Sequence, residues 1–330
     1  MRLATFEYNG ENRVGIVINE DKVADITLAY ASYLHGRGEP KAYKLANILV
    51  PPSMLEIIEG GESSLSSARE AAQALKSIPQ MKGPKGEQVI FALDEVKLKA
   101  PLLRPGKILA IAINNSQGFE KAIKPEGELH PFYFIKLNTC LTGPYDPVEI
   151  PDIGIVGSEV EVAAIISKKG KNIPVEKADE YVFGYTVHND ITAHELRDKK
   201  EWIISVRSET EQVRLTYAGR YKCFDTFAPM GPWLVTKDEI GDIENRKMEA
   251  SINNEVCQLG STSDMTFKFP QLISYLSEAH TLEPGDIISG GTVIGAPGWV
   301  NSKIDLRKLG GDLVSTVEGI GTLRNPINAI

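Results

Sequence analysis

Apolar residues near the start of the chain follow two periods, one typical of strands and one typical of helices. Residues 3–6 and 14–18 are short apolar runs, and the Asn9-Gly10 pair between them predicts a tight hairpin turn. Residues 64–78 are rich in alanine and place apolar side chains at helical spacing. The pattern predicts a small β-containing unit at the start of the chain.

Short strand patterns separated by turn signals dominate the rest of the sequence, without a regular alternation of strand and helix. We expect a boundary near residues 101–106, with a small N-terminal domain over 1–104 and a larger domain over 105–330. The few helical patterns of the larger domain lie at 117–124, 192–204 and 269–279. This organisation predicts a β-rich α+β fold and not a doubly wound sheet.

Composition narrows the function classes. The chain has 330 residues, is 42% hydrophobic and carries a net charge of -8, which is long enough for a sizeable core and argues against a nucleic-acid partner. No apolar run approaches a membrane span and the first residues lack a secretory pattern, so we expect a cytoplasmic protein without a membrane partner. Cys140, Cys223 and Cys257 are widely spaced and are expected to be buried free thiols.

Glu159 and Glu161 open an apolar run that continues to Ile166 and is typical of a buried strand. Because a strand points alternate side chains to one face, the two carboxylates converge. Converging like charges raise a pKa and destabilise the fold unless a cation neutralises them, which favours a metal site. The alternative is the solvent face of an edge strand, but apolar residues continue on both faces after Glu161.

Asp190 follows the next strong strand pattern and is the candidate third ligand. It could instead be only a turn residue, because Thr192-x-x-Glu195 has the form of a capping box at the start of a helix. Three oxygen ligands favour Mg²⁺, with Mn²⁺ or Ca²⁺ as alternatives. The flanking His188 and His194 are expected to be satisfied polar residues and not ligands.

Lys222 lies among aromatic and small residues that predict burial, and a buried lysine needs a partner. It could bind a substrate carboxylate, stabilise an enolate, or pair with Asp225 or another acid. The glycines of residues 290–297 could let backbone N–H groups approach an anion, although a tight turn explains them equally well. The sequence contains no phosphate-loop, serine-hydrolase or zincin motif.

Together these segments resemble the fumarylacetoacetate hydrolase family from about residue 105 to the end. The matching segments are Glu159-Val160-Glu161-Val162-Ala163, Gly184-Tyr185-Thr186-Val187-His188-Asn189-Asp190, Lys222-x-Phe224-Asp225-Thr226-Phe227, Gly231-Pro232-Trp233, Gln258-x-x-x-Thr262-x-x-Met265, Leu282-x-Pro284-Gly285-Asp286 and Gly319-Ile320-Gly321.

The resemblance implies a mixed β-roll catalytic domain, frequent homodimers, and 2-oxo or acylpyruvate-like substrates. It places a Mg²⁺ or Ca²⁺ site on Glu159, Glu161 and Asp190. It also places the family lysine at Lys222, and the glycine and threonine that contact substrate at Gly291 and Thr292.

The chain departs from the family where many members carry a His-Glu acid-base pair on a lid. Gly118 stands at the histidine position and Lys121 at the glutamate position. Hydrolysis then needs another base. Glu120 is the first candidate because it lies on the same segment, and the alternatives are His130 or an acid from elsewhere in the chain.

The region after Asp190 departs from the family as well. His194 replaces the family arginine, and Arg197, one helical turn on, could occupy similar space and bind substrate. An insertion lies around residues 207–217.

These observations leave three functions open. The first is metal-dependent hydrolysis of a carbon–carbon bond in an acylpyruvate-type acid, where the ion polarises the 2-oxo group and holds the enolate. The second is dehydration of a 2-keto-3-deoxy sugar acid, decarboxylation or tautomerisation. None of these reactions needs an activated water, so the missing acid-base pair favours them. The third is a non-catalytic homologue, which the intact carboxylate triad argues against.

Overall fold

The structure is a computed structural model that describes residues 1–116 and 129–330. Its strands are β1 (Arg2–Tyr8), β2 (Glu11–Ile18), β3 (Lys22–Asp25), β4 (Ile90–Ala92), β5 (Lys97–Leu98), β6 (Ile108–Ala112), β7 (Phe132–Lys136), β8 (Leu141–Thr142), β9 (Val148–Ile150), β10 (Val156–Gly157), β11 (Val160–Ile166), β12 (Val182–Asn189), β13 (Thr192–Ala193), β14 (Trp202–Val206), β15 (Gln212–Thr216), β16 (Ala228–Thr236), β17 (Lys247–Ile252), β18 (Glu255–Ser261), β19 (Ile287–Ser289), β20 (Asp312–Val317) and β21 (Gly321–Ala329). Its helices are α1 (Ile26–Gly36), α2 (Ala42–Leu49), α3 (Met54–Glu59), α4 (Gly61–Ser77), α6 (Val175–Ala178), α7 (Ala218–Tyr221), α8 (Lys237–Ile240), α9 (Phe269–Ala279) and α10 (Leu306–Leu309).

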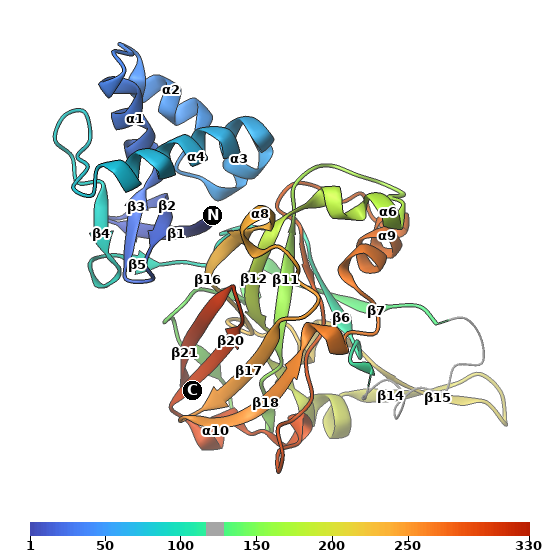
Figure 1. The fold of residues 1–330 in the computed structure, drawn as a ribbon. Helices are drawn as coiled ribbons and strands as arrows, with labels where there is room; N and C mark the ends of the chain where they lie inside the picture. Colours follow the sequence, from blue (N-terminus) through green and yellow to red (C-terminus); the bar gives the residue numbers. More distant parts are fainter. Residues whose placement is uncertain (117–128) are drawn as a thin grey trace.

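The N-terminal unit begins with the predicted hairpin of β1 and β2. Asn9 and Gly10 have φ angles of 51° and 80°, and a type I′ turn requires positive φ at both residues. The helix predicted over residues 64–78 is α4, whereas α1 to α3 were not predicted. Apolar residues surround much of α1 and leave no one-sided stripe, which hides the helical period. Figure 1 shows the four helices gathered on one side of these strands.

The largest sheet joins the N-terminal strands to the rest of the chain. Its described strands follow the order β4-β3-β2-β1-β16-β12-β11-β19-β6-β7, with β5 on β1 and β8 on β16. Strand β1 pairs directly with β16, so the hairpin extends the same sheet that contains β11 and β12. The domain boundary near residue 104 stays a prediction.

A second sheet, in the order β18-β17-β20-β21-β9, packs against β11, β12 and β16 of the first. Every residue of β11 and β12 is buried, which confirms the strand predicted from the apolar run after Glu159. The predicted helix over residues 269–279 is α9, and its apolar face packs on the core through Phe269 and Leu272. The predicted β-rich α+β fold is confirmed.

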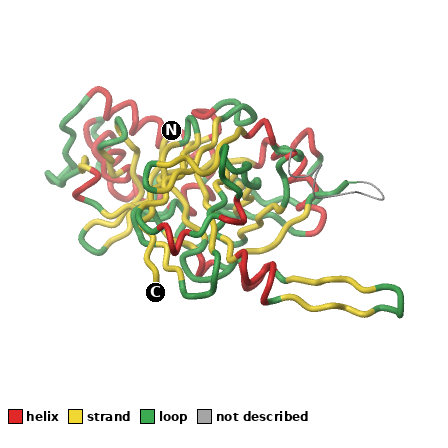
Figure 2. Tube along the Cα trace, turned by 90° about the horizontal axis from the view of Figure 1, so that it is seen from below, coloured by secondary structure: helices red, strands yellow, loops and turns green. Residues whose placement is uncertain are grey.

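The helix predicted over residues 192–204 is largely wrong. Thr192 lies in β13 and donates its hydroxyl to the Asp190 carbonyl at 3.0 Å, so it forms no capping box. A short π-helical turn, Leu196–Lys200, follows, and the β-branched residues after it favour strand β14. Strands β14 and β15 form a two-stranded ribbon, here called the arm, that extends away from the body (Figures 1 and 2).

None of the helices in the described ranges combines the length and the apolar character that a bilayer crossing requires.

Candidate metal centre and active site

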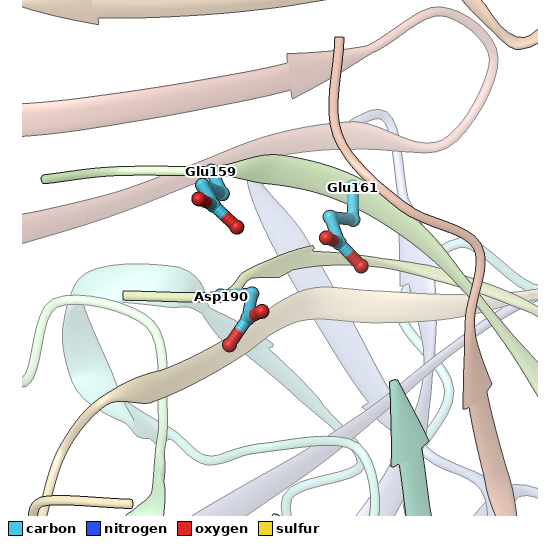
Figure 3. A group of neighbouring side chains, drawn as sticks. All are labelled: Glu159, Glu161 and Asp190. Carbon is cyan, nitrogen blue, oxygen red and sulfur yellow. The ribbon is translucent and has the colours of Figure 1, made fainter. Parts of the chain in front are cut away.

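Two antiparallel strands bring the three predicted ligands together. Glu159 and Glu161 flank the first residue of β11, and Asp190 directly follows β12. The Asp190 amide donates to the Glu159 carbonyl at 2.8 Å, which fixes the two strand ends beside each other. One carboxylate oxygen from each side chain lies within 4.8 Å of the others, and Figure 3 shows the three groups turned toward one another. The convergence expected from the two-residue period is present.

Two buried lysines accompany the carboxylates. The Lys222 ammonium donates to Glu159 Oε2 at 2.7 Å and to Asp190 Oδ2 at 2.5 Å. The Lys136 ammonium donates to Asp190 Oδ1 at 2.5 Å, and both of these side chains are almost fully buried. Lys222 therefore pairs with acids of the triad and not with Asp225. Lys136 was not among the predicted site residues, although a lysine closing the apolar run Phe132–Lys136 was a usable signal.

These pairs set the charge of the groups at neutral pH. Burial raises the pKa of the Asp190 carboxyl, but Lys136 and Lys222 outweigh burial and lower that pKa to about 2. Burial lowers the pKa of the Lys222 ammonium, and the Asp190 and Glu159 carboxylates outweigh it, so the net shift of this pKa is upward. Asp190 is thus a carboxylate and Lys222 an ammonium.

Glu161 is held from the opposite side of the site. Its Oε2 accepts from the Ser289 hydroxyl at 2.5 Å and from the Gly291 amide at 3.1 Å. His188 Nδ1 lies 2.6 Å from Ser289 Oγ and 3.8 Å from Glu161 Oε2. Burial raises the pKa of the Glu161 carboxyl, and the Asp190 charge adds to this rise. A cation between the two carboxylates would favour the ionised form of both.

The donor set fits a hard divalent ion. With all three acids ionised, the three carboxylates and two ammonium groups leave one net negative charge, and the three side chains that converge each offer a carboxylate oxygen. Such oxygen sets suit Mg²⁺, Mn²⁺ or Ca²⁺ better than ions that prefer sulfur or nitrogen.

A cavity of about 580 Å³ opens onto this cluster. Its wall is apolar along the end of β6 and along residues 293–294, whereas its polar side is formed by Glu159, Glu161, Arg197, Arg214, Tyr221, Lys222 and Thr292. An apolar pocket with a few convergent polar groups is the usual form of a small-molecule site.

Gln258 links Thr292, the threonine expected to contact substrate, to the start of strand β11, where Glu159 and Glu161 lie. Gln258 Nε2 donates to Thr292 Oγ1 at 3.2 Å, and Gln258 Oε1 accepts from the Ser158 hydroxyl at 3.1 Å and from the Val160 amide at 3.2 Å. The Thr292 hydroxyl is therefore held at a fixed position in the cavity that Glu159 also lines.

Comparison with known proteins agrees with this geometry. The family model described as fumarylacetoacetate (FAA) hydrolase C-terminal matches residues 107–328. The chain belongs to the fumarylacetoacetate hydrolase family. Two relatives are the oxaloacetate tautomerase YisK of Bacillus subtilis (strain 168), 35% identical over 99% of this chain and 100% of its own length, and the mitochondrial oxaloacetate tautomerase Fahd2a of Rattus norvegicus, 33% identical over 84% of this chain and 80% of its own.

A solved structure of the same family extends the comparison. The maleylpyruvate hydrolase from Sphingobium sp. SYK-6, in complex with manganese(II) ion and pyruvate, matches with a TM-score of 0.68 and 26% identity over 100% of this chain and 99% of its own. Proteins similar to this chain thus include tautomerases and a hydrolase, and the hydrolase structure contains a divalent ion.

For several residues at predicted family positions, the proposed role stays a prediction. Glu120, Gly118 and Lys121 lie outside the described residues. The Gly291 amide faces Glu161, and a contact of Gly291 with substrate stays a prediction. Arg197 lines the cavity and its guanidinium donates to both oxygens of Asp198, at 2.7 and 3.0 Å, so substrate binding by Arg197 stays a prediction.

His194, expected from the resemblance at the position of the family arginine, is not charged at neutral pH. Its side chain is buried, and neither ring nitrogen has a partner among the described residues. Burial lowers the pKa of His194 to about 4. The histidine therefore brings no positive charge to the site at neutral pH.

Proposed function

We propose that this protein is a metal-dependent tautomerase that interconverts the enol and keto forms of a 2-oxo dicarboxylic acid of the oxaloacetate type. The observation that carries the proposal is the acidic triad with its lysine in one cavity, in a chain 35% identical over its length to an oxaloacetate tautomerase.

Glu159, Glu161 and Asp190 would hold the ion, which we propose is Mg²⁺, with Mn²⁺ as an alternative because the hydrolase neighbour binds manganese. A bound divalent cation supplies Lewis-acid stabilisation of negative charge that develops on the 2-oxo oxygen.

Side chains around the ion site are proposed to stabilise charge and orient the substrate. Lys222 remains an ammonium because Asp190 and Glu159 raise its pKa, so it stabilises negative charge and does not act as a base. Its ammonium also lies 5.1 Å from the centroid of the Phe134 ring, a contact that keeps it oriented toward the triad. Thr292 and Arg197, which line the same cavity, are proposed to orient the substrate.

Carbon–carbon hydrolysis is the second candidate, favoured by the likeness to maleylpyruvate hydrolase. Hydrolysis requires a base that activates water. The described carboxylates that line the cavity are Glu159 and Glu161, assigned here to the ion, and Asp198, which is paired with Arg197. Within the described part of the wall no histidine is present, so the base would have to be Glu120 or another group. Tautomerisation needs no activated water: a proton leaves the enol oxygen and another is added to the adjacent carbon, so it requires a proton shuttle but no base for water, and it fits the site better.

The test mixes enol oxaloacetate with Mg²⁺-loaded protein and follows the loss of enol absorbance in the ultraviolet. We expect acceleration that requires the ion, and a loss of about 100- to 1,000-fold in kcat for Lys222→Met, because one stabilising donor is removed. Lys308→Met, an exposed lysine paired with Asp305, is the matched control and should keep the rate.

Product mass separates the candidates. Tautomerisation leaves the mass of the substrate unchanged, hydrolysis of an acylpyruvate adds one water across two products, and decarboxylation or dehydration removes carbon dioxide or water. Absence of enol turnover together with two hydrolysis products would replace the proposal with the hydrolase, and absence of any turnover would favour the non-catalytic homologue.

We also propose, from the family resemblance, that the protein forms a homodimer. Light scattering coupled to size exclusion should give twice the mass of the chain, and a monomer mass would contradict it.

A further inference from the structure

The arm carries an arginine into the cavity of the metal centre. Arg214 lies in β15, opposite Ile204 of β14, and it lines the same cavity as Glu159 and Glu161. The arm overlaps residues 207–217, where the sequence predicts an insertion relative to the family. Arg214 lies outside the segments that resemble the family motifs.

The Arg214 side chain turns back along the arm toward the body. Its guanidinium carbon lies 4.5 Å from the centroid of the Trp202 ring, and Trp202 is the diagonal cross-strand neighbour nearest the base of the arm. Its Nη2 donates to the Asp198 carbonyl, in the π-helical turn that precedes the arm. The aromatic ring and the carbonyl thus hold the guanidinium at the cavity.

The two arginines of the cavity differ in their partners. Arg197 forms a two-pronged ion pair with Asp198, which neutralises its charge. Among the described residues Arg214 forms no ion pair with a carboxylate, and only one of its N–H groups donates to a carbonyl. A guanidinium has five N–H donors in a fork that matches a carboxylate. Arg214 therefore retains the capacity to bind one.

We propose that Arg214 is a specificity-determining residue that binds the distal carboxylate of a 2-oxo dicarboxylic acid, an inference that rests on the proposed function. The 2-oxo acid end of the substrate faces the acidic triad and Lys222, and the other carboxylate faces the arm. A 2-oxo monocarboxylic acid such as pyruvate lacks the group that Arg214 recognises, so the arm selects dicarboxylic acids.

The test compares wild type with Arg214→Met, which keeps the aliphatic contact with Trp202 and removes the charge. With Mg²⁺ present, we expect the KM for enol oxaloacetate to rise about 10- to 100-fold, as for loss of a hydrogen-bonded charge partner, with a smaller change in kcat. Inhibition by oxalate, which lacks a distal carboxylate, should stay within about twofold. An unchanged KM would overturn the assignment, as would an equal weakening of oxalate.

Two variants control the experiment. Arg207→Met removes an exposed arginine of the same arm that pairs with Glu211 and does not line the cavity, and it should leave KM unchanged. Arg214→Lys keeps the charge without the fork and should fall between wild type and Arg214→Met. Equal impairment of the lysine and methionine variants, or impairment of Arg207→Met, would contradict recognition by the Arg214 charge.

Measuring ligand binding tests the role of Arg214 independently of tautomerase activity. If wild type turns over no enol oxaloacetate, thermal melting of the Mg²⁺-loaded protein with oxaloacetate or with pyruvate still reports selectivity. Stronger stabilisation by oxaloacetate that disappears in Arg214→Met and persists in Arg207→Met supports the inference while the tautomerase proposal fails. No preference in wild type, or a preference that survives in Arg214→Met, overturns the inference.

Discussion

The ammonium of Lys136 lies 2.5 Å from Oδ1 of Asp190, with both side chains almost completely excluded from solvent. Lys136 also donates to the carbonyl of Lys222, the residue whose ammonium holds the other oxygen of the same carboxylate. One lysine thus neutralises a predicted metal ligand and fixes the backbone of the second lysine. The centre depends on this internal cation even before any ion binds.

Replacing Lys136 with methionine should therefore destabilise the protein strongly. Removing one partner of a buried ion pair leaves an uncompensated charge and costs about 3 to 5 kcal/mol. Lys97→Met removes a surface pair with Asp146 and should cost less than about 1 kcal/mol. Urea unfolding measures both changes, and equal losses in the two variants would show that Lys136 has no special role.

Gly291 has a positive φ and no space for a Cβ, and comparison with a second glycine separates these two constraints. Its φ is +94°, and a Cβ would lie 2.8 Å from the Cβ of Asn114, whose side chain bonds Phe267 and Gly290. Gly298 has a φ of +87° with open space around a Cβ. Gly291→Ala should lose about 1 to 3 kcal/mol more than Gly298→Ala, because overpacking adds to the shared backbone strain.

Gly291→Ala should also weaken metal-dependent activity, because the Gly291 amide donates to Glu161. Gly298→Ala should retain it. Unfolding curves and initial rates check the two expectations, which fail if the two alanine variants behave alike.

His194 should make stability depend on pH. Its pKa is lowered to about 4 from 6.5, so the unfolded chain binds this proton first as the pH falls. The stabilising contribution is complete above pH 6.5 and is lost progressively toward pH 4. Between pH 7 and pH 5 wild type should lose about 2 kcal/mol more than His194→Leu.

The leucine variant is a fair comparison, because neither His194 ring nitrogen has a partner among the described residues. His35→Gln, at an exposed position on α1, should follow the wild-type pH dependence. Urea unfolding at the two pH values gives the result, and parallel pH dependence of wild type and His194→Leu would refute it.

The core of the site could be predicted from the sequence because it depends on local patterns. A period of two residues places Glu159 and Glu161 on one face, and continued apolar residues bury the strand. The end of the next strand supplies Asp190 by simple antiparallel pairing. Repulsion among the three carboxylates is weaker than their pattern alone predicts, since Lys136 and Lys222 already neutralise part of the cluster.

The parts that were missed depend on contacts between distant segments. Lys136 is 54 residues from Asp190 in the sequence, and nothing local indicates where its side chain goes. The helix predicted over residues 192–204 runs into the start of β14, because the charged run before Trp202 has good helix formers, whereas the β-branched residues after it pair with β15. The guanidinium of Arg214 at the cavity follows only from that pairing.

The central claim is that the acidic triad holds the ion that drives turnover, and a Mg²⁺ titration of the enol-oxaloacetate rate tests it most directly. Glu161→Gln keeps the shape of the side chain and removes its charge, whereas Glu255→Gln changes an exposed glutamate on β18 and serves as control. We expect wild type and Glu255→Gln to share a saturable Mg²⁺ response, and Glu161→Gln to require at least about 100-fold more ion or to lose the response. A Glu161→Gln titration that overlays that of wild type, or a wild-type rate that does not depend on the ion, would contradict the account.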